Sequence, residues 1–105
     1  MSERRTSERK RVLLEARWMS MSGRHEARVD DVSLGGCFVN THGHVEMDEP
    51  VELEILLPSG GWLKLRGTVA SYHPGVGFGM WFRFVNAAER SALKELIASA
   101  AERSV

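Results

Sequence analysis

The residues of this chain with the clearest binding chemistry form two short groups. The first lies in the N-terminal segment, where Arg5 and Arg9 are spaced as Arg-x-x-x-Arg and Arg4 directly precedes them. A guanidinium group can hold a phosphate through two parallel hydrogen bonds, and its flat face can stack on a ring. Two such groups on one segment could therefore reach different parts of a single anionic ligand.

The second group is the segment 31–36, Asp-Val-Ser-Leu-Gly-Gly, which has the pattern Asp-x-Ser-x-x-Gly. The Asp31 carboxylate can accept hydrogen bonds from a ring edge that carries N–H donors, and the Ser33 hydroxyl can accept or donate. Gly35 and Gly36 would let the backbone turn sharply and approach a ligand with no Cβ in the way. Each group alone usually binds nothing, because basic termini are mostly solvated and Asp and Ser are ordinary turn residues.

The rest of the chain must supply the frame that positions these groups. At 105 residues it can form one domain with one modest core. Residues 1–11 carry five basic and two acidic side chains and little that is apolar, so we expect a flexible arm there. Residues 12–85 alternate apolar and polar positions between turn signals, which is typical of β-strands. Residues 86–103 have helical periodicity and begin like a capping box.

These elements predict a mainly β fold, a small antiparallel barrel of about six strands closed by one C-terminal helix. The chain has 14 basic and 14 acidic residues, and zero net charge does not suggest nonspecific nucleic-acid binding. It contains no apolar run near the length of a membrane span, and its polar N-terminus does not resemble a signal peptide, so we expect no membrane insertion. Cys37 is the only cysteine, which agrees with a cytoplasmic location, and we expect it to be buried.

Nothing in the sequence suggests catalysis. Ser33 has no motif with a histidine that would make it a nucleophile, and no glycine-rich phosphate loop precedes a helix. His42 and His44 lie close together, but no third ligand at metal-like spacing completes a site. We therefore expect neither an enzyme nor a metal or cofactor site.

In this order and spacing, and followed by β-type sequence, Arg5-x-x-x-Arg9 and Asp31-x-Ser33-x-x-Gly36 resemble the two motifs of the PilZ domain family. The resemblance covers nearly the whole chain and includes the glycine-rich and aromatic segment 77–82. It implies a bacterial six-stranded PilZ-type barrel with a C-terminal helix. It also implies a receptor for the second messenger cyclic di-GMP, whose two phosphodiesters and two guanines fit the chemistry of the two groups.

The resemblance also implies which residues contact the ligand. We expect the arm to fold across the barrel onto cyclic di-GMP seated against the segment 31–36. The predicted contacts are Arg4, Arg5, Arg9, Asp31, Ser33, Gly35 and Gly36.

Arg4 supports a separate hypothesis about stoichiometry. In the family an apolar residue at this position tends to accompany one bound ligand, and an arginine tends to accompany an intercalated pair. We therefore expect two cyclic di-GMP molecules per protomer, with Arg4 stacking on or bridging a second guanine; the alternative is that Arg4 only adds charge. A receptor without an attached output domain must relay its signal to a separate effector protein, which in the family acts in motility, pili, exopolysaccharide or transcription.

Two other functions compete with this interpretation. The chain could be an interaction scaffold with the PilZ fold but no ligand, which the intact motifs argue against. It could also be a single-stranded nucleic-acid binder, as small barrels often are, but zero net charge argues against that. The acidic segment 46–54 is expected to be a solvated turn and strand face. Trp81 falls on the opposite strand face from Phe78 and Met80, and it could mark a partner surface if that face is exposed.

Overall fold

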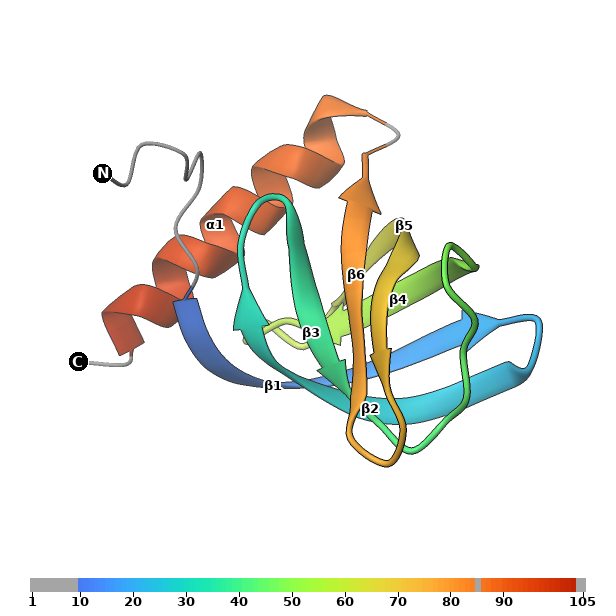
Figure 1. The fold of residues 1–105 in the computed structure, drawn as a ribbon. Helices are drawn as coiled ribbons and strands as arrows, with labels where there is room; N and C mark the ends of the chain where they lie inside the picture. Colours follow the sequence, from blue (N-terminus) through green and yellow to red (C-terminus); the bar gives the residue numbers. More distant parts are fainter. Residues whose placement is uncertain (1–9, 85, 104–105) are drawn as a thin grey trace, which may run out of the picture.

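The computed structural model describes residues 10–84 and 86–103 and shows a closed antiparallel barrel with one helix (Figure 1). Around the barrel the strands follow the order β1-β2-β3-β6-β5-β4, and β4 pairs back onto β1. The predicted fold class is therefore confirmed. The elements are β1 (Lys10–Ser20), β2 (Gly23–Val32), β3 (Gly36–Asn40), β4 (Pro50–Leu56), β5 (Trp62–His73), β6 (Gly77–Arg83) and α1 (Ala87–Arg103).

The predicted boundaries differ slightly from these. β1 begins at Lys10, so Lys10 and Arg11, which we assigned to the arm, belong to the barrel. Residues 1–9, the remainder of the predicted arm, lie outside the described residues, and Arg4, Arg5 and Arg9 are among them.

The core follows from the alternation of apolar and polar residues along the strands. On β4, for example, Val51, Leu53 and Ile55 are buried, while Glu52 and Glu54 between them are partly exposed. The buried Trp18 of β1 donates its indole N–H to Thr41 Oγ1 at 3.0 Å, which satisfies the one polar atom of that ring. Inward-facing side chains from all six strands thus fill the barrel.

The helix α1 lies across one end of the barrel (Figure 1). Its first turn is capped by Asn86, whose Oδ1 accepts a hydrogen bond from the backbone N–H of Glu89 at 3.0 Å, as the sequence predicted. Leu93 and Leu96 of α1 are buried in the core, so the helix is held by its apolar stripe. No helix within the described ranges is long and apolar enough to cross a membrane.

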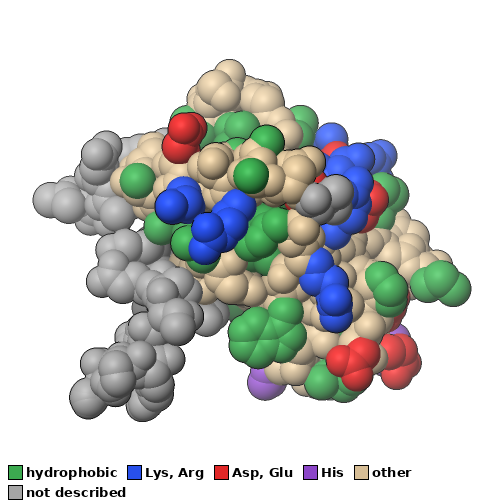
Figure 2. All heavy atoms as spheres, turned by 90° about the horizontal axis from the view of Figure 1, so that it is seen from above, with side chains coloured by type: hydrophobic (Ala, Val, Ile, Leu, Met, Phe, Trp, Pro, Cys, Tyr) green, Lys and Arg blue, Asp and Glu red, His purple; other side chains and the backbone are tan. Residues whose placement is uncertain are grey.

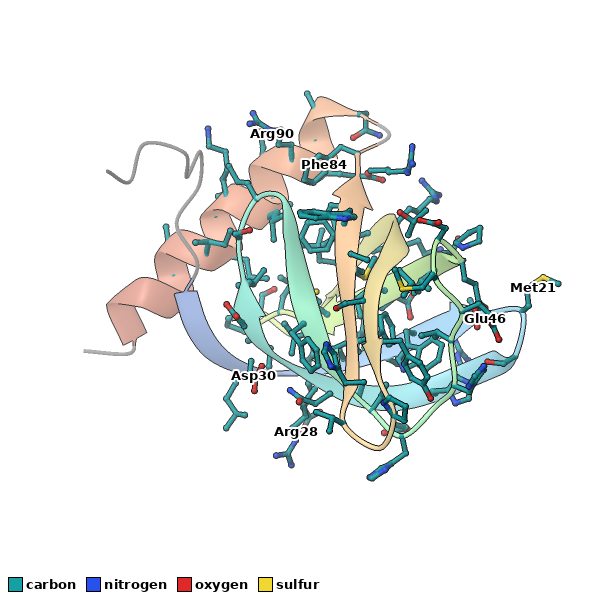
Figure 3. All side chains as sticks on the ribbon, in the orientation of Figure 1. Met21, Arg28, Asp30, Glu46, Phe84 and Arg90 are labelled. Carbon is teal, nitrogen blue, oxygen red and sulfur yellow. The ribbon has the colours of Figure 1, made fainter. Side chains whose placement is uncertain are left out.

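Register shifts interrupt three strand pairings, β1 with β2, β2 with β3 and β5 with β6, and the last two concern the site. The pairing of β2 with β3 shifts between Val29 and Asp31, and Val29 and Val32 are both fully buried although they are three residues apart. Strict alternation cannot do this, whereas an inserted residue at Asp30 can. Figure 3 shows the Asp30 side chain pointing away from the barrel. The pairing of β5 with β6 shifts in the same way between Val69 and Ser71.

Candidate functional site

The strand register aligns the predicted motif with an outward-facing row that crosses four strands. Asp31 of β2 is opposite Phe38 of β3, Phe38 is opposite Gly79 of β6, and Gly79 is opposite Ser71 of β5. The two bulges are what bring Asp31 and Ser71 into this row. Asp31 is half-buried and lies at one end of the row.

A second row of cross-strand partners runs alongside the first and forms the other edge of the candidate site. In this row Gly36 of β3 is opposite Trp81 of β6, and Trp81 is opposite Thr68 of β5. Between the two rows lies a shallow hollow of about 270 Å³. It is lined by Gly36, Cys37, Phe38, Ala70, Ser71, Gly79, Met80 and Trp81. The floor consists largely of small residues, so a flat group could approach the sheet backbone closely.

Gly36 has a structural role that the sequence did not reveal. A Cβ built on Gly36 would stand 2.1 Å from the Met80 backbone oxygen, so β3 and β6 can pair this closely only with glycine at this position. A Cβ on Gly35 would have its nearest neighbour, Ser33 Oγ, at 3.9 Å. Neither glycine is among the residues with positive φ, so the turn does not need glycine for its backbone angles. From the sequence we expected glycine here because of a sharp turn. The structure shows that Gly36 is needed because β3 and β6 pack closely at this position.

Ser33 shapes the turn between β2 and β3. Its side chain is 4% exposed, and its Oγ accepts a hydrogen bond from Gly35 N at 3.2 Å and donates one to Gly36 O at 3.4 Å. The Ser33 backbone N–H also donates to Gly36 O at 2.8 Å. The hydroxyl therefore holds the loop in place, and a direct contact between Ser33 and a ligand stays a prediction.

The point where the arm joins the barrel is beside the motif. In the pairing of β1 with β2, Lys10 is opposite Val32 and Arg11 is opposite Asp31. Arg9 is the residue before Lys10, and Arg5 is five residues before it, so the Arg5 backbone can lie at most roughly 18 Å from this point. The structure brings Asp31, Ser33, Gly35 and Gly36 together; the three arginines lie outside the described residues, although their attachment point adjoins Asp31.

Trp81 is part of the site, although the sequence predicted only that its side chain faces outward. Its side chain is 61% exposed, as the alternation along β6 predicted, while Phe78 and Met80 are buried. The sequence could not show that Trp81 is the cross-strand partner of Gly36, because that depends on which strands are neighbours in the barrel. Phe38, whose ring is 5.8 Å from the His73 ring, borders the other side of the hollow. An exposed indole thus lines the hollow, and Asp31 lies one strand further on, as the cross-strand partner of Phe38.

The acidic segment 46–54 does not line the hollow, and several of its carboxylates have partners. The Glu46 backbone N–H donates to Glu49 Oε1 at 2.8 Å, and this hydrogen bond lowers the pKa of Glu49. Glu54 accepts a hydrogen bond from Arg17, which lowers the pKa of Glu54. His44 pairs with Glu46 at 2.8 Å, and no group of three or more metal-ligating side chains occurs in the described part of the chain.

Comparison with known proteins places the chain in a family. A sequence model of the PilZ domain matches residues 3–99, which include the three arginines and the segment 31–36. The chain belongs to the PilZ domain family. No match was found among curated protein sequences.

Solved structures share this fold. The PilZ domain of YcgR from Escherichia coli, solved with cyclic di-GMP, has a TM-score of 0.81 at 14% identity, over 97% of this chain and 95% of that chain. The PilZ domain of CeSA from a cellulose-synthesizing bacterium has a TM-score of 0.71 at 19% identity, over 88% and 96%. The MrkH–cyclic di-GMP complex from K. pneumonia has a TM-score of 0.78 at 15% identity, and this chain covers only 54% of that protein.

Proposed function

We propose that this PilZ domain binds cyclic di-GMP on the outer face of β2, β3 and β6, between Asp31 and Trp81. The observation that carries the proposal is the hollow itself, whose floor of small residues on β3, β5 and β6 is bordered by Phe38 and Trp81. Asp31 of β2 is the cross-strand partner of Phe38 on one side and of Arg11, close to the arm, on the other. Membership of the PilZ family supports it, as do the related structures solved with this ligand.

The chemistry of the hollow suits a guanine base. Guanine presents N1–H and an N2 amino group as donors, and the Asp31 carboxylate can accept from both. The exposed Trp81 indole offers a face for stacking, which contributes about 1–3 kcal/mol per base in proteins that bind single-stranded nucleic acids. The hollow of about 270 Å³ is smaller than the roughly 300–1,000 Å³ typical of sites for drug-sized ligands, so it can hold only part of the molecule.

The arm then supplies the remainder of the site. Arg5 and Arg9 would fold over the bound ligand and hold its phosphodiesters, and Arg4 would contact the guanine of a second molecule, giving two ligands per protomer. The chain acts in this proposal as a receptor without catalytic activity, which orders its arm on binding and relays the signal to a separate effector protein.

Isothermal titration of the purified chain with cyclic di-GMP tests the proposal. Arg9→Ala should weaken binding by at least about tenfold, because a charge-assisted hydrogen bond to phosphate is lost. Arg24→Ala, a change to an exposed arginine at the start of β2, is the matched control and should leave binding unchanged. An excess of GTP should not compete.

The molar ratio decides the stoichiometry. A ratio of two that falls to one in Arg4→Leu supports the two-ligand hypothesis, and an unchanged ratio rejects it. If neither heat nor thermal stabilisation is seen at high ligand concentration, the receptor function is rejected and the scaffold function stands instead. Salt-sensitive binding of an oligonucleotide in preference to cyclic di-GMP would indicate a nucleic-acid binder.

A further inference from the structure

A second, larger groove lies on the outer surface across β1, β4, β5 and the end of β6. Thr68 lies at its border with the hollow. It has a volume of about 730 Å³, and most of the surface that lines it is apolar. Figure 3 shows Phe84 at the end of β6, beside the first turn of α1 where Arg90 lies. The groove extends from there to the end of β1, and its lining residues are Met19, Ser20, Pro50, Val51, Glu52, Arg66, Gly67, Thr68, Arg83 and Phe84.

Two arginines stand side by side in this groove. Arg66 of β5 and Arg83 of β6 are direct cross-strand partners, an arrangement of like charges that destabilises a sheet. The positive charge of Arg66 is offset by two carboxylates: its Nε lies 3.7 Å from Glu52 Oε2, and its Nη1 lies 3.6 Å from Glu89 Oε2. Both distances are longer than a hydrogen bond. Arg83 is exposed and has no ion pair among residues 10–84 and 86–103. The groove therefore combines an apolar lining with the positive charge of Arg83, which pairs with no carboxylate among the described residues. Figure 2 shows that basic side chains are prominent on the face of the molecule that carries α1.

We propose that this groove binds an acidic amphipathic helix of a partner protein. Across the groove Met19 pairs with Glu52, Glu52 with Arg66 and Arg66 with Arg83, so its surface is a sheet face and contacts must be made by side chains. The partly exposed Met19 and Phe84 would receive the apolar stripe of the helix, and a flexible methionine suits such a surface. Arg83 would hold a carboxylate of the helix in a bidentate pair. The apolar lining favours a peptide over a phosphate-rich nucleic acid.

The groove adjoins the proposed ligand site through two connections. Thr68, which lines the groove, is the cross-strand partner of Trp81, which lines the hollow. The backbone N–H of Phe82 donates to Gly35 O at 2.9 Å, and the Phe82 ring lies 6.0 Å from the ring of Phe84. This inference rests on the relay step of the proposed function, since it names the surface and the chemistry of the partner.

The test is a phage-displayed library of random helical 16-residue peptides, panned against the full chain with and without cyclic di-GMP. We expect enriched peptides with an apolar stripe at i, i+3 and i+4 and flanking Asp or Glu. A synthetic peptide of the enriched sequence should shift the amide resonances of Val51, Thr68 and Arg83 in a ¹⁵N spectrum. Arg83→Glu should weaken its binding by at least about tenfold, because attraction becomes repulsion, and Met19→Ser should weaken it by a smaller factor.

Lys94→Glu is the control, because it makes the same charge reversal at an exposed position of α1 outside the groove. The proposal is overturned if no peptides are enriched, if the enriched peptides are basic, if the shifts map elsewhere, or if Arg83→Glu and Lys94→Glu act alike. Titration of each variant with cyclic di-GMP alone separates the two proposals. An Arg83→Glu variant that loses the peptide and keeps cyclic di-GMP supports the groove as a separate site. In the unaltered chain, absence of any peptide binding with intact cyclic di-GMP binding rejects the groove only, and the reverse result rejects the ligand site only.

Discussion

Substituting alanine for Gly36 should destabilise the barrel much more than substituting alanine for Gly35. A Cβ on Gly36 would lie 2.1 Å from the Met80 oxygen, and real contacts of this kind are not shorter than 3.0 Å, so β3 and β6 would have to separate by almost 1 Å. The barrel is closed, and β6 is paired with β5 on its other edge, which leaves no free edge to move. A separation of this size breaks nearby hydrogen bonds, such as Phe82 N to Gly35 O at 2.9 Å.

The magnitude follows from the number of bonds affected. Losing two or three backbone hydrogen bonds at ~1 kcal/mol each lowers the free energy of unfolding by roughly 2–3 kcal/mol. For a domain of this size that lowers Tm by roughly 10–20 °C.

Urea and thermal denaturation followed by circular dichroism measure the effect. Gly35→Ala is the control, because its Cβ has space and its φ is not left-handed, so its stability should change by no more than about 0.5 kcal/mol. Equal stabilities for the two variants would refute the argument that Gly36 is fixed by strand packing.

Three further predictions concern the ligand, acid stability and the helix cap. Trp81→Ala should weaken cyclic di-GMP binding by at least about fivefold in calorimetry through loss of stacking, whereas Trp62→Ala, at another exposed tryptophan outside the hollow, should not. The pKa of Glu54 is lowered by its hydrogen bond from Arg17, so the stability that this pair contributes is present above the ordinary pKa of 4.5 and is lost as the pH falls through the lower folded value. Glu54→Gln should therefore flatten the acid limb of a plot of unfolding free energy against pH, and an unchanged limb would contradict this. Asn86→Ala should cost ~1 kcal/mol in urea denaturation through loss of the cap on α1, whereas Asn86→Asp should cost much less.

The alternation of apolar and polar residues was enough to predict the barrel and the helix. Along β4 and β6 the pattern distinguishes buried positions from outward ones, and it correctly left Trp81 facing outward while Phe78 and Met80 are buried. The helix cap at Asn86 was equally readable, because capping depends on residues only three apart in sequence. Local signals thus predict local structure reliably in this chain.

The arrangement of the site could not be predicted in the same way. The bulge at Asp30 determines that Asp31 faces outward beside Phe38, and a bulge has no fixed sequence signature. The order of the strands around the barrel also determines the site, because β3 pairs with β6 rather than with β4, the next strand in sequence. Only that non-local pairing places Trp81 opposite Gly36 and gives Gly36 its packing role.

The residues of the site therefore divide into those that hold its backbone in place and Trp81, whose exposed side chain can contact a ligand. Ser33 and Gly36 are occupied by the turn and by β6, so substituting either changes the position of the loop before it changes any contact. Trp81 lines the hollow and is largely exposed, on a strand that is paired on both sides, so its side chain can vary without disturbing the barrel. Loss of binding in Ser33→Ala together with lost stability would reflect the loop, whereas loss of binding in Trp81→Ala with stability unchanged would report a contact with the ligand itself.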